Sequence, residues 1–112
     1  MRAFALLGVA VLMLAGQAVS AQDKAVIEHG AQVYAAQKCS VCHAVAGKGN
    51  KKGVMDDVGT KLSGDEIRQW IVAAPEMAKK AKSTRKPAMK SYPNLPKEDL
   101  DALVAYLQTL KG

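Results

Sequence analysis

The chain has 112 residues, of which 49% are hydrophobic and 23% charged. This balance excludes a disordered tail, and the length excludes a multidomain enzyme, so one small domain is expected. Aromatic residues make up only 4%, and the 16 Lys and Arg outnumber the 10 Asp and Glu, giving a formal charge of +6 at pH 7. We therefore expect a core with few large side chains, which something else has to fill. The positive charge indicates a negatively charged partner, which is an acidic protein surface, a nucleic acid or an anionic membrane.

The N-terminal segment has the pattern of a secretory signal peptide. One basic residue precedes an apolar run over residues 3–15, and small residues lead up to Ala21. A retained membrane anchor is the alternative, but this run is shorter than the ~20 residues needed to cross a bilayer. We expect cleavage after Ala21, or after Ser20, which divides the chain into a signal peptide, 1–21, and a mature domain, 22–112.

The mature domain has the periodicity of helices, and no run alternates apolar and polar residues as a strand would. Asp23 is placed to cap a first helix over about residues 24–38, whose apolar face includes Gly30. A glycine in the middle of that face costs ~1 kcal/mol relative to alanine, which is understandable where another helix approaches closely.

Two further helices are predicted, with no strands. Ser63 and Glu66 form a capping-box pattern that opens a middle helix, and Pro75 is expected to end it. A last helix opens near Pro96 and ends near Lys111, with leucines along its apolar stripe. The loops between these helices are long for so small a domain, so we expect them to wrap around something.

Cys39, Cys42 and His43 form the pattern Cys-x-x-Cys-His, which is the attachment site of a c-type haem. Two thiols at this spacing reach the two vinyl groups of one porphyrin as thioethers, and the adjacent histidine binds the iron. A thioredoxin-like dithiol would require a βαβ setting, and a zinc site would require a fourth ligand, for which His29 is the candidate. We predict one covalently attached haem c and, because this attachment takes place outside the bacterial inner membrane, a periplasmic location.

Gly30 and Tyr34 ahead of the haem motif, Met89 in Lys-Pro-Ala-Met, and the closing helix together resemble a class I, mono-haem cytochrome c. The resemblance covers about residues 24–111. It implies an all-α fold in which three main helices and long loops surround the haem. It also implies that the first and last helices cross near Gly30 and Tyr106.

The same resemblance implies that His43 and Met89 are the two iron ligands, and that Cys39, Cys42, His43 and Met89 bind the cofactor. Met55 and Met77 are the alternatives to Met89, and both are more simply interpreted as core residues.

The chain departs from the family pattern near both iron ligands. Relatives often have Gly-Pro where this chain has Gly53-Val54, and the proline carbonyl accepts the histidine Nδ1 proton, so the carbonyl of Val54 is the expected acceptor. The intervals before the haem motif and before Met89 are longer than usual. Lys90 follows the methionine where relatives often have an uncharged residue.

The remaining aromatic residues and histidine are given simpler roles. Trp70 falls where relatives place an aromatic side chain near the methionine side of the haem, and an ordinary core position is an equal alternative. Tyr34 and Tyr106 are expected at helix interfaces, and the role of Tyr92 is left open. His29 is expected to face solvent, since it lies off the apolar face of the first helix.

We expect an electron carrier rather than an enzyme, because the predicted iron has a ligand on both sides. A cytochrome subunit of a periplasmic dehydrogenase or oxidase, or a haem peroxidase-like enzyme, is the alternative. The basic clusters around the expected haem edge favour acidic redox partner proteins. They comprise Lys38, Lys48, Lys51, Lys52, Lys79, Lys80, Lys82, Arg85, Lys86 and Lys90. Neither a nucleic acid nor a small-molecule substrate is expected, and the protein is expected to be a monomer.

Overall fold

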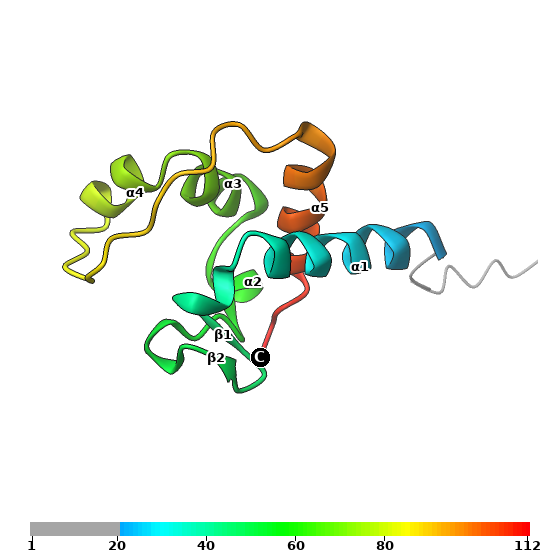
Figure 1. The fold of residues 1–112 in the computed structure, drawn as a ribbon, viewed down its shortest axis with the longest axis horizontal. Helices are drawn as coiled ribbons and strands as arrows, with labels where there is room; N and C mark the ends of the chain where they lie inside the picture. The colour runs from blue at the N-terminus through cyan, green and yellow to red at the C-terminus, as the bar shows by residue number, and fades with distance from the viewer. Residues whose placement is uncertain (1–20) are drawn as a thin grey trace, which may run out of the picture.

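Helices form most of the regular structure of this chain. The computed structural model describes residues 21–112, which contain five α-helices and one two-stranded sheet (Figure 1). The predicted signal peptide, residues 1–21, lies outside the described residues except for Ala21. None of the helices within 21–112 is both long and apolar enough to cross a membrane.

Helix α1 spans Ala21–Ala36, and so begins and ends earlier than predicted. Asp23 therefore lies within its first turn rather than ahead of it, where a carboxylate interacts favourably with the positive end of the helix dipole. The helix ends before Lys38, whose φ of 58° places it in the left-handed conformation. This reversal leads the chain into the short 3-10 helix η1, Cys39–Val41.

The middle of the chain contains two helices where one was predicted. Helix α3, Gly64–Val72, opens with the predicted capping box, in which Ser63 Oγ accepts the Glu66 N–H at 3.2 Å and Glu66 Oε1 accepts the Ser63 N–H at 3.1 Å. This helix ends at Val72, ahead of Pro75 as predicted, but a second helix follows at once. Pro75 lies in the first turn of α4, Ala74–Lys80, where the missing N–H leaves no hydrogen bond unmade.

The last helix, α5, spans Lys97–Gln108, opens after Pro96 as predicted, and ends before Lys111. The short helix α2, Val58–Lys61, was not predicted, because four residues are too few to show an apolar face.

A small β-hairpin corrects the expectation that the chain has no strands. Strand β1, Ala44–Val45, pairs antiparallel with β2, Lys48–Gly49. Ala46 and Gly47 join the two strands with φ values of 51° and 79°, as both central residues of a type I′ turn require. Strands of two residues are too short for alternation to be recognised in the sequence. The 3-10 helix η2, Lys51–Gly53, follows the hairpin.

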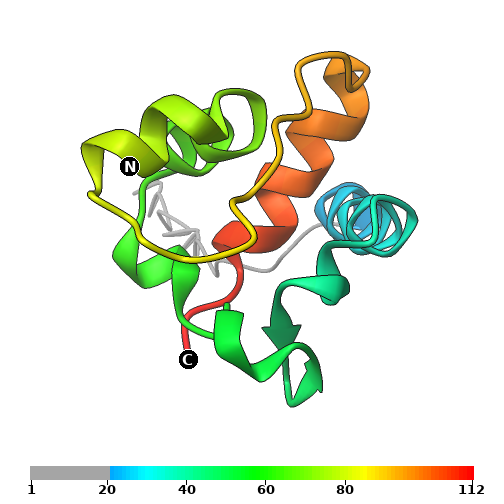
Figure 2. The same ribbon diagram turned by 60° about the vertical axis from the view of Figure 1, so that its left-hand side comes forward.

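Helices α1 and α5 cross in close contact, as Figures 1 and 2 show from two directions. Gly30 is buried at this crossing, and an added Cβ would overlap the Ala102 carbonyl and the Cβ of Tyr106. Nearby, the rings of Tyr34 and Tyr106 meet edge to face, with centroids 5.8 Å apart. The predicted crossing near Gly30 and Tyr106 is therefore confirmed.

His29 takes part in the same contact between α1 and α5. Its Nε2 lies 2.7 Å from Oδ1 of Asp99. The interpretation of His29 as a solvent-facing residue is only partly right, because its side chain is 42% exposed but also links the two helices.

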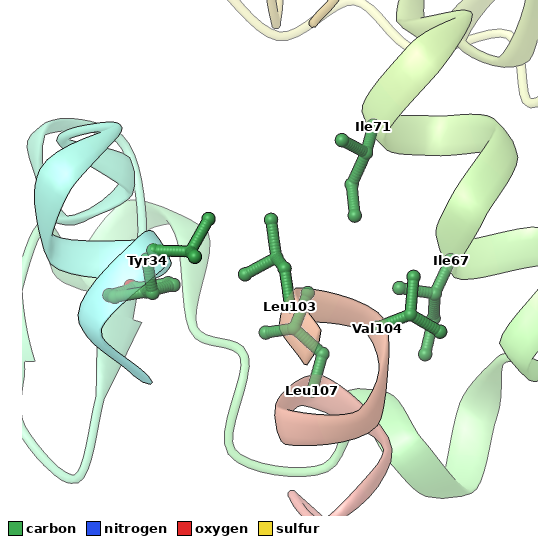
Figure 3. Packing of buried hydrophobic residues seen from close by; sticks show 7 residues of the cluster. Tyr34, Ile67, Ile71, Leu103, Val104 and Leu107 are labelled. Atoms are coloured by element: carbon green, nitrogen blue, oxygen red, sulfur yellow. The ribbon is translucent and has the colours of Figure 1, made fainter. Parts of the chain in front are cut away.

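The buried hydrophobic cluster draws on α1, α3 and α5. It contains Val33, Tyr34, Ile67, Ile71, Leu103, Val104 and Leu107. In Figure 3, Tyr34 from α1 and Ile71 from α3 lie on either side of Leu103 from α5. Most of these side chains also line a cavity.

Candidate functional site

A cavity of about 210 Å³ lies among α1, α3, α5 and the segments that join them. It is lined by Tyr34, Gln37, Cys39, His43, Met55, Val58, Leu62, Ile67, Trp70, Ile71, Met89, Tyr92, Leu95, Leu103 and Leu107. Nearly all of these side chains are apolar or aromatic, as is typical of sites for large hydrophobic ligands. The segment between α1 and α2 supplies Gln37, Cys39, His43 and Met55, and the segment between α4 and α5 supplies Met89 and Tyr92.

The cavity brings the predicted site residues together. Cys39, His43 and Met89 line it, and Cys42 lines an adjoining cavity of about 80 Å³ whose wall includes the same three residues. Met89 is distant from the other three in sequence and reaches them on the segment between α4 and α5. Figure 2 shows this segment, in yellow to orange, running across the middle of the molecule.

The turn at η1 places both thiols beside the histidine. The carbonyl of Cys39 accepts the N–H of Cys42 at 3.1 Å and the N–H of His43 at 2.9 Å. Both cysteines are half-buried, and no disulfide joins them. Burial raises the pKa of the Cys39 thiol, so this thiol is protonated at neutral pH.

His43 is oriented by its own backbone neighbourhood. Its Nδ1 lies 3.0 Å from the carbonyl oxygen of Gly53, which can only accept, so Nδ1 carries the proton and Nε2 has a free lone pair. Burial lowers the pKa of His43 below its usual value, and the nearby charge of Arg85 acts in the same direction, whereas the bond to Gly53 opposes both. A neutral imidazole with a free Nε2 is suited to binding a metal ion.

The acceptor of the His43 proton differs from the expected one. The carbonyl of Val54 was predicted, but the bond goes to Gly53, one residue earlier. Val54 instead forms a parallel β-bridge with Ala44, the residue after His43. This bridge aligns the two segments so that the buried Gly53 faces the imidazole.

The three candidate methionines lie in different places. Met89 lines both cavities, Met55 lines only the larger one, and Met77 lies in α4 outside the lining of either. The N–H of Met55 donates to the carbonyl of Ala44 at 2.9 Å, so Met55 belongs to the same wall as His43. Met89 comes from a separate segment, between α4 and α5, and lines both cavities together with His43.

The chain is similar to known proteins over most of its length. A family model described as cytochrome c matches residues 27–111. The chain belongs to the cytochrome c family. It is 32% identical over 91 residues to a cytochrome c oxidase subunit 2 from Alkalihalophilus pseudofirmus. That match covers 73% of this chain but 25% of the relative, so the chain spans about a quarter of that protein's length. No solved structure matches the chain significantly.

Membership of the cytochrome c family confirms the predicted fold and cofactor, a mostly helical domain with covalently bound haem c. The residues present fit this group, because two thiols and a neutral imidazole with a free Nε2 line the apolar cavity and the smaller cavity beside it. Tyr34 adds a second sign of a missing partner. Its hydroxyl oxygen is buried, has no hydrogen-bond partner among the described residues, and belongs to a side chain that lines the cavity.

Burial is the main cause that raises the pKa of the Tyr34 phenol to about 12. The hydroxyl is therefore a neutral donor throughout the physiological range, able to donate to an acceptor within the cavity.

Two residues at the cavity have roles that the sequence reasoning missed. Tyr92 lines both cavities, and its backbone N–H donates to the carbonyl of Ile71 at 2.7 Å. Arg85, treated only as one member of a basic cluster, donates from Nη2 to the carbonyl of Cys42. The close spacing of Tyr92 to Met89 was a signal for the first role. Nothing in the sequence indicated the second, since it joins residues far apart in the chain.

Proposed function

We propose that this cytochrome c is a periplasmic one-electron carrier in which Cys39 and Cys42 hold the haem and His43 and Met89 bind its iron. The observation that carries the proposal is that Cys39, His43 and Met89 line one apolar cavity and that Cys42 lines the smaller cavity beside it. When bound, haem c supplies an iron that gains and loses one electron.

The protein's own part is to occupy both sides of the iron and to keep water away. The bond from His43 Nδ1 to Gly53 fixes the imidazole so that Nε2 is the ligand atom. A thioether from Met89 as the second protein ligand would leave no open position for oxygen or peroxide, and as a soft ligand it would favour ferrous iron. A site closed in this way suits electron transfer rather than catalysis.

The charge distribution supports docking to acidic redox partners. Residues 79–90, here called the basic segment, carry six basic residues and no acidic residue, which equals the net charge of +6 of the whole chain. Every basic side chain in this segment is exposed, and the segment includes Met89. A positive surface beside the cofactor steers an acidic partner to the place where the electron leaves.

The location follows from the N-terminal sequence. The signal-peptide pattern of residues 1–21 and the haem motif both require export, so we propose a mature periplasmic protein that begins at Gln22 and acts as a monomer. Export also argues against nucleic acid as the partner of the basic segment.

A second candidate is a haem-bearing subunit of a larger oxidoreductase. The similarity to part of a cytochrome c oxidase subunit 2 favours this candidate. Purification from the native membrane and periplasmic fractions distinguishes the two, because a free carrier is recovered alone in the soluble fraction and a subunit is recovered with its complex.

The ligand assignment is tested by replacing the methionines one at a time. In the oxidised protein we expect a weak near-infrared band from sulfur-to-iron charge transfer. Met89→Ala should abolish this band, lower the reduction potential and admit cyanide to the iron, because the soft ligand is lost. Met55→Ala and Met77→Ala are the controls and should keep the band. Loss of the band in a control instead would refute the assignment of Met89, and a wild type without any sixth protein ligand would favour the peroxidase-like enzyme.

A further inference from the structure

The segment that carries Met89 has few attachments to the rest of the molecule. Residues 81–88 are all exposed. The hydrogen bonds made by Ser83 and by the backbone of Arg85 stay within α4 and this segment. The segment is next fixed at Tyr92, whose N–H donates to Ile71.

The side chain of Arg85 is the exception, because it attaches this segment to a distant part of the chain. Among the described residues, its side chain is the one group between Lys82 and Ser91 that forms a hydrogen bond to a distant part of the chain, from Nη2 to the carbonyl of Cys42. Arg85, Cys42 and Met89 all line the smaller cavity. The guanidinium group therefore bridges the methionine segment and the haem-attachment turn at the edge of the cofactor site.

A second contact shows how closely this guanidinium is fitted. An added Cβ at Gly53 would collide with both Nη1 and Nη2 of Arg85 and with the Cys42 carbonyl. Gly53 is also the residue whose carbonyl accepts the proton of His43. Arg85 thus lies against the two backbone groups that position the proximal side of the site, the turn of Cys42 and the acceptor of His43.

We propose that Arg85 is a positioning residue that fastens the methionine segment to the haem-attachment turn and so keeps Met89 on the iron. This proposal rests on Met89 being the sixth ligand. The planar, permanently charged guanidinium suits the role, because a charged donor makes a stronger bond to a carbonyl than a neutral one does. A lysine retains the charge, but its compact ammonium group lacks the planar fork of donors and cannot reproduce the fit against Gly53.

In this role, Arg85 controls how often the segment that carries Met89 opens. Loss of a hydrogen bond with a charged donor at an exposed position corresponds to a change of about tenfold in the equilibrium between closed and open forms. An external ligand such as imidazole binds ferric iron only after Met89 leaves. Its binding rate therefore reports the opening directly, without any partner protein.

The experiment compares the haem-loaded wild type with Arg85→Gln, Arg85→Lys and Lys86→Gln. Lys86→Gln is the matched control, because it removes one positive charge from the next residue, which makes no hydrogen bond in the described structure. We expect imidazole to bind Arg85→Gln about tenfold faster than wild type, Arg85→Lys at an intermediate rate, and Lys86→Gln at a rate within about twofold of wild type. The visible spectrum of the reduced protein, in which the thioether bond is stronger, checks that each variant is folded.

The outcomes separate this proposal from the one on which it rests. Equal imidazole rates for Arg85→Gln and Lys86→Gln, with a Met89-dependent near-infrared band in wild type, would overturn the role of Arg85 and leave the electron carrier intact. A wild type whose band does not depend on Met89 would overturn the ligand assignment and the role of Arg85 together. A faster rate in Arg85→Gln with the band retained supports both.

Discussion

Two positions need glycine because a side chain would not fit, Gly53 beside the haem motif and Gly30 at the crossing of α1 and α5. At Gly53 an added Cβ would meet the guanidinium of Arg85 and the carbonyl of Cys42, so the absence of a side chain lets the backbone approach the haem motif. At Gly30 the obstacle is the backbone of α5, at the carbonyl of Ala102. A backbone atom within a helix cannot move aside as a flexible side chain can.

We therefore predict that Gly30→Ala separates α1 from α5 and lowers the free energy of unfolding by about 2 kcal/mol, despite the better helix propensity of alanine. Gly64→Ala is the matched control. Its added Cβ would meet the side-chain amide of Gln108, which can rotate away, so little change is expected. Chemical denaturation of the two haem-loaded variants measures both effects, and equal stability of Gly30→Ala and wild type would show that the crossing tolerates a methyl group.

Single residues also mark the limit of prediction from this sequence. The haem motif was recognisable because its residues lie close together in the chain. Met89 was recognisable because its interval in sequence before the last helix is the one usual in the cytochrome c family. The bonds from His29 to Asp99 and from Arg85 to Cys42 join distant positions, which no local pattern reveals. The proton acceptor of His43 was displaced by one residue, because the bridge between Ala44 and Val54 sets the register.

Among the elements of the fold, the basic segment has the greatest excess of positive over negative charge. It begins in α4, continues through the exposed residues before Met89, and carries a charge equal to the net charge of the chain. Figure 1 shows α4 at one end of the described structure and the beginning of α1 at the other. We therefore expect an acidic redox partner to be attracted to one end of the molecule.

Small inorganic oxidants test this attraction without a natural partner. We predict that ferricyanide, an anion, oxidises the reduced protein faster at low than at high ionic strength, and that a cationic ruthenium complex shows the opposite trend. Lys80→Glu should slow the reaction with ferricyanide severalfold at low salt. Lys24→Glu, the same change near the beginning of α1, should have a much smaller effect. Equal effects of the two substitutions would mean that only the net charge matters.

The elements themselves were predicted unevenly. The capping box at Ser63 and the end signals of α5 identified two helices, because each signal involves a few neighbouring residues with one physical role. Pro75 marked the end of α3 correctly but also stands in the first turn of α4, since a proline that ends one helix is equally suited to the first turn of the next. Helix α2 and the hairpin at Ala46 are shorter than the periods by which helices and strands are recognised.

At the scale of the whole molecule, the hydrophobic cluster is small and much of it faces the cavity. A chain of this size buries too little apolar surface to offset the ordering of its long loops. A bound haem would supply the missing apolar surface, because side chains from α1, α3 and α5 line the cavity. The fold is therefore expected to depend on the cofactor.

We predict that replacing both Cys39 and Cys42 by alanine leaves a chain without a cooperative thermal transition. The two substitutions remove little buried surface themselves, so a large effect would come from loss of the covalently held haem. Circular dichroism during heating measures the transition, and the matched control is Ser40→Ala, which changes an exposed residue between the two cysteines. A sharp native-like transition in the double variant would contradict the dependence of the fold on haem.

The central claim, that this cytochrome c carries single electrons at a closed iron site, is tested most directly by a redox titration of the purified protein followed in its visible spectrum. The account predicts one reversible transition with a slope of about 59 mV per tenfold change in the ratio of oxidised to reduced protein, as a one-electron centre requires. Rapid reoxidation of the reduced protein by oxygen, turnover of peroxide, or a transition that is not reversible with this slope would contradict it.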